Sequence, residues 1–395
     1  MYRRGMIVRV LAGLAILAAL AHLVDNIARR GPWWAGTDFA VYWWASYFWR
    51  TGQPLYTGLP AHPEMTPIYV YAYPPTLAVL FVPLTFLPYQ VAWWLCGLTF
   101  LAGALAAVWL TLTLIGLRGL ERLVLFAAFL WFPPLHYEAA LLNVNLVVLA
   151  GLALAWAMRR RDEGWAALLA GLAVGFLAGI KLHPALLLVP LLMRPGRRPL
   201  VVAGFAGGLV PAAVALALTA HEFRAFLWVL SGMGLTWTGL PLPADLSVWG
   251  SAIYWLGPQA GPVVAALVAA GLLALAGWLS WPRREQVDEV WSLWLVVLLL
   301  VSPVTWPQYF ILLALPLFLV WLRARANWPA SRRIVRGLLL TAILMCLPPV
   351  TNDLPGWVNL FSTIGQAVGL WLCFGLVLVV LFRPGGADEG TVVAG

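Results

Sequence analysis

The sequence predicts an all-α integral membrane protein whose chain crosses the bilayer about twelve times. Of its 395 residues, 63% are hydrophobic and only 10% are charged. A soluble domain of this length carries far more charge, because its surface must face water. Apolar runs long enough to cross ~30 Å of hydrocarbon recur along the whole chain. They include residues 6–25, 90–116, 200–220, 258–281 and 358–382.

The chain is predicted to form a single membrane domain over residues 1–383. No polar stretch is long enough to fold as a separate domain of ~50 residues or more. The remaining residues, 384–395, are rich in glycine and small side chains and are predicted to be a disordered cytoplasmic tail. The first apolar run, 6–25, follows basic residues as a signal peptide does. No small-x-small cleavage site follows it closely, so we interpret it as a retained first helix.

The net charge of +9 comes from short basic clusters between apolar runs. This is the positive-inside pattern of a membrane protein, so we expect membrane lipids and no nucleic acid among the partners. Placing the clusters in the cytoplasm puts both termini inside and makes the number of crossings even. It also predicts that residues 26–75, 136–145, 181–184, 221–257, 302–307 and 348–357 face outward.

Residues 76–88, TLAVLFVPLTFLP, do not fit this scheme. They are apolar but too short and too rich in proline for a regular span. If they crossed alone, every later segment would change sides. We interpret them as a re-entrant or half-membrane segment, which is stable only where other parts of the protein cover its backbone.

The sequence contains no pattern that would hold a metal or a nucleotide. The cysteines Cys96, Cys346 and Cys373 lie in apolar runs without ligand spacing, and we interpret them as small buried hydrophobic residues. There is no metal motif, phosphate-cradling loop, dinucleotide fingerprint or nucleophile elbow. We therefore expect no metal and no cofactor, and we place any chemistry on the outer face.

The first outward segment carries an unusual combination of residues. Arg29 and Arg30 stand at its start, on the side of the membrane where basic residues are scarce. Residues 39–50, FAVYWWASYFWR, carry aromatic side chains on most faces, which predicts an interfacial helix. Asp38, just before them, has two interpretations. It caps the start of this helix, a role that Thr37 fills equally well, or it is a functional carboxylate.

Lys181 is the only lysine in the chain and has apolar residues on both sides. An ionisable group in such a segment is costly and indicates a function or a charged partner. The alternative is that its side chain reaches the outer interface, because Pro184 marks a turn there. We favour the functional interpretation. His183, beside that proline, is a weaker candidate, since a histidine at a turn commonly satisfies its hydrogen bonds locally.

A third polar group lies in residues 136–145, HYEAALLNVN. Glu138, Asn143 and Asn145 are expected at the outer ends of two neighbouring helices. The two asparagines are interpreted either as site residues or as helix caps and turn formers.

Two more outward segments contain candidate residues. In residues 302–310, two prolines break a helix near Trp306 and Gln308, and discontinuous helices often line sites inside membranes. Residues 221–257 are rich in glycine and tryptophan and include Arg224. They are interpreted either as a mobile cover over a substrate or as an interfacial loop.

The order of these features resembles a known family. The loop TDFAVYWWASYFWRTGQPLYTG is followed by YAYPPTLAVLFVPLTFLP, then by LLNVNLVVLAGLALAW, AGIKLHPALLLVPLL and SPVTWPQYFILLALPL. From residue 1 to about residue 320, the chain resembles the membrane glycosyltransferases of the GT-C superfamily, most closely glycosyltransferase family 87. That family includes polyprenol-phosphate-mannose-dependent α-mannosyltransferases. The resemblance implies a polytopic helical fold of the GT-C type in the cell membrane.

The resemblance also implies a reaction. Asp38 matches the family's catalytic aspartate and is expected to act as general base in an inverting displacement. The implied donor is a polyprenyl-phosphate-hexose, with mannose expected, and the implied acceptor is a glycolipid or glycan on the periplasmic or exterior face. In many relatives the segment after the serine-proline and tryptophan carries a histidine, and this chain has Pro307-Gln308-Tyr309 there instead. The first asparagine of Asn143-Val144-Asn145 is often glutamine in relatives.

Several side chains are expected to bind the substrates in that reaction. Cations would stabilise the departing phosphate, Tyr42 lies one helical turn after Asp38, and Trp33, Trp34 and Trp43 are expected to stack on sugar or guide the isoprenoid. The predicted substrate-binding residues are Arg29, Arg30, Tyr42, Glu138, Asn143, Asn145, Lys181, His183, Arg224, Trp306 and Gln308.

Three other functions compete with this hypothesis. A transporter or flippase for lipid-linked glycans would also place cations near headgroups, but the sequence shows no repeat symmetry. An O-antigen ligase or polymerase would use a lipid-diphosphate donor, and a loop rich in arginine would favour it. Arg224 is the only arginine in residues 221–257. A purely structural membrane protein would explain the hydrophobicity but neither the single lysine nor the ordered outward motifs.

Overall fold

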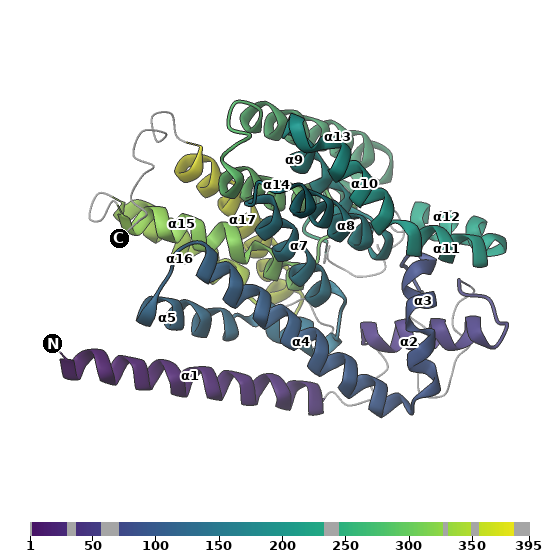
Figure 1. Cartoon of the computed structure of the whole chain (residues 1–395), viewed down its shortest axis with the longest axis horizontal. Helices are drawn as coiled ribbons and strands as arrows, with labels where there is room; N and C mark the ends of the chain where they lie inside the picture. Colours follow the sequence, from purple (N-terminus) through teal and green to yellow (C-terminus); the bar gives the residue numbers. More distant parts are fainter. Residues whose placement is uncertain are drawn as a thin grey trace. The chain divides into compact units, whose positions relative to one another are not determined.

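The computed structural model describes residues 2–29, 37–56, 71–232, 245–326, 331–348 and 355–382. In these ranges the chain forms α-helices and short 3-10 helices, and no strand (Figure 1). This confirms the predicted all-α, polytopic fold. The chain divides into two compact units, Met1–Trp237 and Thr238–Gly395. The predicted tail at 384–395 lies outside the described residues.

The first unit contains twelve α-helices in its described part. The N-terminal helices are α1 (Tyr2–Arg29), α2 (Asp38–Arg50), α3 (Pro75–Phe81), α4 (Tyr89–Leu114), α5 (Gly119–Leu130) and α6 (Pro133–Leu141). They are followed by α7 (Asn145–Arg159), α8 (Gly164–Ile180), α9 (Leu188–Leu192), α10 (Arg198–Gly208), α11 (Val210–Leu218) and α12 (Phe223–Gly232). The 3-10 helices η1 (Val82–Phe86), η2 (His183–Leu187), η3 (Pro195–Arg197) and η4 (Ala220–Glu222) connect some of them.

Helix packing in this unit positions the candidate active site. Helix α5 packs on α1 and on α4, and α7 packs between α4 and α8 (Figure 1). Helix α8 also packs tightly on α10, because glycines let the two backbones approach. A Cβ atom on Gly204 would collide with the Leu168 carbonyl, and one on Gly175 with the Phe205 carbonyl. Such glycine contacts are typical of helix pairs in membranes.

The second unit contains five α-helices in its described part. They are α13 (Val248–Ser280), α14 (Val287–Val301), α15 (Ala314–Ala326), α16 (Arg332–Met345) and α17 (Gly356–Leu381), with η6 (Pro307–Leu313) before α15. Gly257, at a φ of 77°, interrupts α13. Helix α14 ends at Val301, and Pro307 begins η6. The chain is therefore non-helical between them, as the prolines of 302–310 predict.

The expected apolar runs correspond closely to long helices. Six helical segments in the described part are long and apolar enough to cross a membrane: Met6–Arg29, Tyr89–Leu114, Pro195–Leu218, Val248–Ser280, Pro307–Ala326 and Gly356–Leu381. Helices α5 and α6, bent by 53°, form a seventh if the pair is one span. The count of about twelve crossings stays a prediction. Large apolar side chains of α1 are exposed, as expected of a helix that faces lipid.

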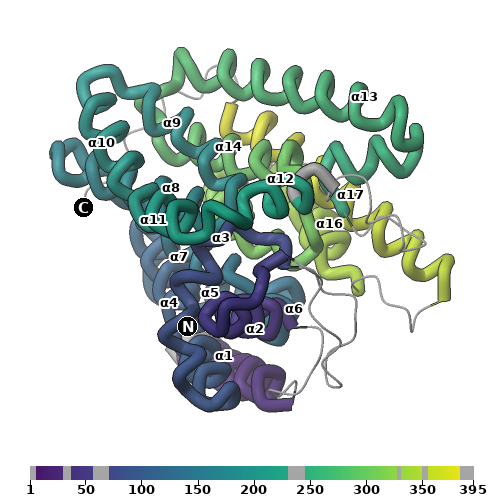
Figure 2. The backbone as a smooth tube through the Cα atoms, turned by 90° about the vertical axis from the view of Figure 1, so that its right-hand side faces the viewer, coloured from purple at the N-terminus to yellow at the C-terminus, as the bar shows by residue number. Residues whose placement is uncertain are grey.

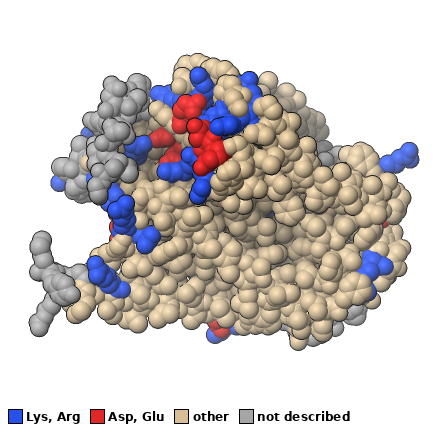
Figure 3. All heavy atoms as spheres, in the orientation of Figure 1, with Lys and Arg blue, Asp and Glu red and all other residues tan. Residues whose placement is uncertain are grey.

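Basic and acidic side chains are sparse on one face of the described part of the molecule. On the face drawn in Figure 3, most atoms belong to uncharged residues, and the charged side chains gather in small groups. This distribution matches a chain that is mostly surrounded by hydrocarbon.

Residues 76–88 form a short, bent segment. They are divided between α3 and η1, which begins with Val82 and Pro83 at its first turn. In Figure 2, α3 lies beside α8 and α11, and it also contacts α2. Other helices thus cover this backbone, as a re-entrant segment requires. Whether it enters the membrane from one side stays a prediction.

The segment 221–257 was expected to be a loop, and that expectation is wrong for its two ends. Residues 223–232 form α12, and α13 begins at Val248. The Glu222 carboxylate accepts a hydrogen bond from the Leu55 backbone N–H at 2.9 Å, which ties this region to residues 26–75, the first segment predicted to face outward. Residues 233–244 lie outside the described part of the chain.

Candidate active site

Asp38 is the first residue of α2, but it does not cap that helix. The cap is Thr37, whose Oγ1 accepts a hydrogen bond from the Ala40 backbone N–H at 3.3 Å. The interpretation of Asp38 as the cap is therefore wrong. Its carboxylate is left for other contacts, and its side chain is only half-buried.

The Asp38 carboxylate accepts hydrogen bonds from two distant parts of the chain. Asn143 Nδ2, in the turn between α6 and α7, donates to Oδ2 at 2.8 Å. The Tyr73 hydroxyl, just before α3, donates to Oδ1 at 3.4 Å. Asn143 Nδ2 also donates to the Tyr73 hydroxyl at 3.3 Å. Three segments far apart in sequence thus meet at one carboxylate.

The turn that carries Asn143 has a constrained backbone. Leu142 ends α6 in the left-handed region, with φ 50° and ψ 46°, a conformation that costs a leucine ~1 kcal/mol or more. Asn143 Oδ1 accepts a hydrogen bond from the Asn145 backbone N–H at 2.9 Å. Because that oxygen is occupied within the turn, the amide nitrogen must face Asp38. Asn143 is therefore both a turn former and a site residue.

Two tyrosines extend this contact. The Tyr42 hydroxyl donates to the Tyr73 hydroxyl at 3.0 Å, and the Val144 backbone N–H lies 3.5 Å from the Tyr42 oxygen. A chain of hydrogen bonds therefore runs from Tyr42 through Tyr73 to Asp38. We call Asp38, Tyr42, Tyr73 and Asn143 the Asp38 cluster.

Tyr73 was not among the predicted site residues. The available signal was its place in YAYPP, one of the motifs that carry the family resemblance. A tyrosine before two prolines looks like a turn residue in sequence, and only the folded structure shows that its hydroxyl reaches Asp38.

Next to this cluster lies a second, more deeply buried group. The Lys181 ammonium donates to Asn145 Oδ1 at 2.7 Å, and Asn145 Nδ2 donates to Glu138 Oε1 at 2.5 Å. All three residues are buried, and Glu138 and Asn145 have no exposed surface. Lys181 Nζ lies 5.8 Å from the centre of the Tyr73 ring. We call Glu138, Asn145 and Lys181 the Lys181 group.

The electrostatics of Asp38 suit a proton acceptor. Burial raises the pKa of its carboxyl above the ordinary value, while the hydrogen bond from Asn143, the positive charge of Lys181 and the hydrogen bond from Tyr73 oppose that rise. A raised pKa makes this carboxylate more basic than an exposed one. Asp38 can therefore take a proton from a bound hydroxyl group.

Several predicted site residues are not brought to this cluster by the described contacts. Arg29 is exposed and forms an ion pair with Asp25 of its own helix at 2.7 Å. Arg224 is exposed on α12. His183 is half-buried at the start of η2, two residues after Lys181. Arg30, Trp33 and Trp34 lie outside the described residues.

The remaining candidates have other surroundings. Trp43 is buried; its Nε1 donates to the Leu84 carbonyl at 3.2 Å and its ring stacks on Tyr47. It packs α2 against η1 and does not present a free face to a sugar. Trp306 and Gln308 belong to the second unit, at the break before η6. Among the described residues, no group of three or more His, Cys, Asp and Glu side chains is arranged to hold a metal.

A family model matches the part of the chain that carries most of this site. The model of glycosyltransferase family 87 matches residues 71–303, more than half of the chain. The chain belongs to glycosyltransferase family 87. The match to the family includes Tyr73, Asn143 and the whole Lys181 group, and it begins after α2, which carries Asp38.

The chain is also similar to two curated proteins of the same description. The chain is 30% identical over 274 residues to the polyprenol-phosphate-mannose-dependent alpha-(1-2)-phosphatidylinositol pentamannoside mannosyltransferase of Mycobacterium tuberculosis, over 67% of this chain and 60% of that protein. It is 28% identical over 258 residues to the protein of the same description from Mycolicibacterium smegmatis, over 64% of this chain and 60% of that protein. The chain thus matches about 60% of the length of these relatives. No solved structure matches it significantly.

Proposed function

We propose that this protein is a membrane mannosyltransferase that uses a polyprenyl-phosphate-mannose donor. It transfers the sugar to a glycolipid or glycan acceptor on the outer face of the membrane, with inversion at the anomeric carbon. Membership of family 87 supports a glycosyltransferase, and the names of the two relatives support the donor.

The observation that carries the proposal is the geometry of Asp38. A half-buried carboxylate, held by Asn143 and Tyr73, lies in one hydrogen-bonded region with the buried Lys181 ammonium. One group is suited to accept a proton and the other to attract a phosphate oxygen. These are the two charges that a displacement of phosphate by a hydroxyl group requires.

The reaction follows from these roles. The oxygen of an acceptor hydroxyl attacks the anomeric carbon and forms the new glycosidic bond, while its proton passes to Asp38. The bond between the anomeric carbon and the phosphate oxygen breaks, and its electron pair leaves with the polyprenyl phosphate. Lys181 stabilises the charge that develops on that phosphate. Phosphate leaves without a proton, so a single carboxylate base is sufficient.

Burial favours one of the described cations that were proposed from sequence. Arg29 and Arg224 are exposed, whereas Lys181 is buried and linked to the Asp38 cluster through the turn at 143–145. Buried charges act more strongly than exposed ones because water screens them less. We therefore assign the phosphate contact to Lys181 first.

We place the active site outside and both termini in the cytoplasm, from the positions of the basic clusters. Polyprenyl-phosphate donors lie in the membrane, so an acceptor hydroxyl at the outer surface meets the sugar at the lipid boundary. The flippase and O-antigen ligase hypotheses gain no support from the family or from the relatives.

A transfer assay tests the proposal. Purified protein is incubated with radiolabelled polyprenyl-phosphate-mannose and a panel of acceptors that includes a phosphatidylinositol mannoside. We expect a mannosylated product whose new linkage has the anomeric configuration opposite to that of the donor. Retention of configuration would contradict the single displacement.

Asp38→Asn tests the base. It preserves the shape of the side chain but cannot accept the proton, so we expect transfer to fall by about 100-fold or more. Asp162→Asn is the matched control, because the Asp162 side chain is 84% exposed. If Asp38→Asn retained full turnover, the base would be another residue.

A further inference from the structure

The surroundings of Lys181 contain a feature that the proposed reaction does not use. Lys181 and Glu138 are both buried, and a neutral amide stands between them: Lys181 donates to one end of the Asn145 side chain, and the other end donates to Glu138. Glu138 Oε2 has no hydrogen-bond partner among the described residues. A buried charge needs compensation from a partner.

The orientation of Asn145 follows from chemistry. An ammonium group can only donate hydrogen bonds, so the amide oxygen must face Lys181. A carboxylate can only accept them, so the amide nitrogen must face Glu138. Asn145 thus connects Lys181 and Glu138 through two hydrogen bonds and keeps the ammonium from direct contact with the carboxylate.

The backbone places these three residues with little freedom. Lys181 follows the last residue of α8, where the chain leaves the helix in an extended conformation and its N–H still bonds to the Leu177 carbonyl at 2.8 Å. Glu138 is in the last turn of α6 and Asn145 is the first residue of α7. The left-handed Leu142 makes the sharp turn between them. A strained residue at such a turn is retained when the surrounding contacts require it.

We infer that Glu138 and Asn145 are positioning residues that hold the Lys181 ammonium beside the Asp38 cluster as a phosphate-binding group. Glu138 supplies the counter-charge that a buried lysine needs. Through its hydrogen bonds to both residues, Asn145 lets Glu138 stabilise the Lys181 ammonium. A direct ion pair with Glu138 would instead neutralise the positive charge that the phosphate needs. The inference rests on the proposed function, because it takes a lipid phosphate as the ligand of Lys181.

Two variants separate the roles of charge and of the bridge. Glu138→Gln keeps an acceptor for Asn145 and removes the negative charge. Asn145→Asp places a carboxylate directly against Lys181. In both variants we expect the KM for the polyprenyl-phosphate-mannose donor to rise about 10-fold or more, with a smaller change in kcat, because the ammonium is displaced or neutralised before the phosphate arrives.

The pH profile gives a readout that a purely structural role would not change. Without the charge of Glu138, the Lys181 ammonium loses its proton more easily. The alkaline limb of kcat/KM is therefore expected at lower pH in Glu138→Gln than in the wild type. The charged and titratable groups described around Lys181 include Glu138, Asp38 and His183, beside the Asn145 amide and the Tyr73 ring, and of these only Glu138 is changed in that variant.

A matched control comes from the second unit. Glu289 is another buried carboxylate beside a cation, since Arg323 donates to it at 2.6 Å. Glu289→Gln removes the same charge from a pair outside the proposed site. We expect its donor KM and alkaline limb to match those of the wild type.

A double-variant cycle on thermal unfolding keeps the inference testable where activity is too low to measure. Glu138→Gln and Lys181→Met each leave one buried charge uncompensated, whereas the double variant leaves neither. We expect the double variant to have a higher Tm than the sum of the two single losses predicts.

The outcomes are distinct. Additive Tm losses, together with unchanged donor KM and pH limb in Glu138→Gln and Asn145→Asp, would overturn the inference while wild-type transfer still supported the proposed function. If the wild type transferred no mannose from the donor, the proposed function itself would fail, and the unfolding cycle would then report only on the charge pair.

Discussion

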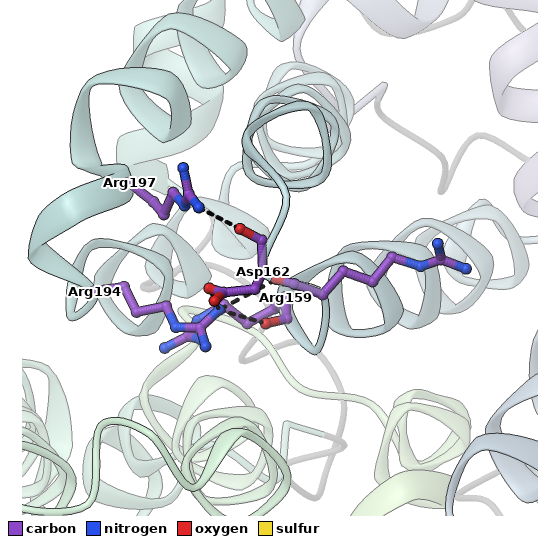
Figure 4. A network of polar contacts seen from close by, with 5 residues as sticks. Arg159, Asp162, Arg194 and Arg197 are labelled. Atoms are coloured by element: carbon purple, nitrogen blue, oxygen red, sulfur yellow. Dashed lines mark hydrogen bonds and ion pairs between the residues drawn. The ribbon is translucent and has the colours of Figure 1, made fainter.

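The two ends of the helix pair α7 and α8 carry polar networks of opposite character. At one end lie the buried Asn145, which begins α7, and Lys181, which follows α8. At the other end, where α7 finishes and α8 starts, lies a network that we call the arginine turn (Figure 4). It consists of Arg159, Asp162, Arg194 and Arg197.

The contacts in the two networks differ in kind. In the arginine turn, Arg194 donates to the carbonyls of Arg159 and Arg161, and Arg197 donates to the carbonyl of Asp162. The only carboxylate in this network, that of Asp162, is 84% exposed. In the Asp38 cluster and the Lys181 group, the hydrogen bonds to the Asp38 and Glu138 carboxylates come from other side chains. Asp162 is exposed, Arg194 and Arg197 are half-buried and Arg159 is buried, so this network mainly holds the turn between α7 and α8, and water screens the charge of Asp162.

The proposed orientation rests in part on the arginine residues at one end of this helix pair. Helices α7 and α8 have 15 and 17 residues, so each is roughly 22–26 Å long at 1.5 Å per residue. If the arginine turn lies on the cytoplasmic side, as the positive-inside rule predicts, the other end of these helices, with the Asp38 cluster, would face outward.

The largest expected effect comes from placing a second carboxylate in the Asp38 cluster. In Asn143→Asp, two carboxylates would meet where the hydrogen bond is now 2.8 Å long. Their repulsion would keep Asp38 protonated at neutral pH, and we expect kcat/KM to fall by about 100-fold or more. Initial rates of mannose transfer measure it. Asn26→Asp, at an asparagine that contacts His136 in another part of the unit, is the control. Near-normal transfer by Asn143→Asp would show that Asp38 is not the base.

Removing one cation from each end of the helix pair tests the comparison directly. Lys181→Met removes the buried ammonium, and we expect kcat/KM to fall roughly 10- to 100-fold, the value of a charge-assisted hydrogen bond to phosphate. Arg194→Met removes a cation of the arginine turn and should change kcat/KM by less than about twofold. Equal losses in the two variants would contradict the assignment of Lys181 to the site.

A smaller effect is expected from the hydroxyl of Tyr73. Tyr73→Phe removes one long hydrogen bond, 3.4 Å, from a neutral donor to the Asp38 carboxylate, so we expect transfer to fall about 3- to 10-fold. Tyr42→Phe, one step further along the hydrogen-bond chain, should have the smaller effect of the two. A larger loss in Tyr42→Phe would mean that Tyr42, and not Tyr73, contacts the substrate.

The acid limb of the pH profile of transfer is expected to depend on Asp38 and Tyr73. Burial raises the pKa of Asp38, and the base acts only when deprotonated. Transfer should therefore rise with pH through a value above the ~3.9 of an ordinary aspartate. Tyr73→Phe removes a hydrogen bond that lowers this pKa, so its acid limb should lie at higher pH than in the wild type. Profiles of kcat/KM against pH measure the acid limb of the wild type and of Tyr73→Phe. An unshifted acid limb in the variant would show that the Tyr73 hydroxyl does not act on Asp38.

Much of the fold was predictable because hydrophobicity along the chain is a strong signal. The runs 90–116 and 358–382 became α4 and α17 within two residues at each end. The break at 302–306 followed from its prolines, which cannot continue a helix. Short helices such as α7 and α8 were harder to assign as spans, because their length falls below the usual ~20 residues.

The site was predictable only in part, for a physical reason. Asp38 and Lys181 were identifiable as charges in apolar surroundings, which are costly wherever they occur. Arg29 carries the same charge as Lys181 in sequence, yet it is exposed and paired within α1. Burial distinguishes Lys181 from Arg29 as a candidate site residue, and a side chain becomes buried only when the helices pack. The hydrogen bond from Tyr73 likewise depends on three segments that meet in space.

The smallest expected effect distinguishes a surface network from a functional one. Asp162→Asn removes the negative charge of the arginine turn but keeps its backbone carbonyl, to which Arg197 donates. Because the side chain is exposed and the ion pair to Arg194 is 3.5 Å long, water already screens most of the interaction. We expect transfer to change by less than about twofold and the Tm by about a degree. A loss of activity comparable with that of Asn143→Asp would show that the two ends of α7 and α8 are coupled, and the arginine turn would then need a role in catalysis as well as at the membrane surface.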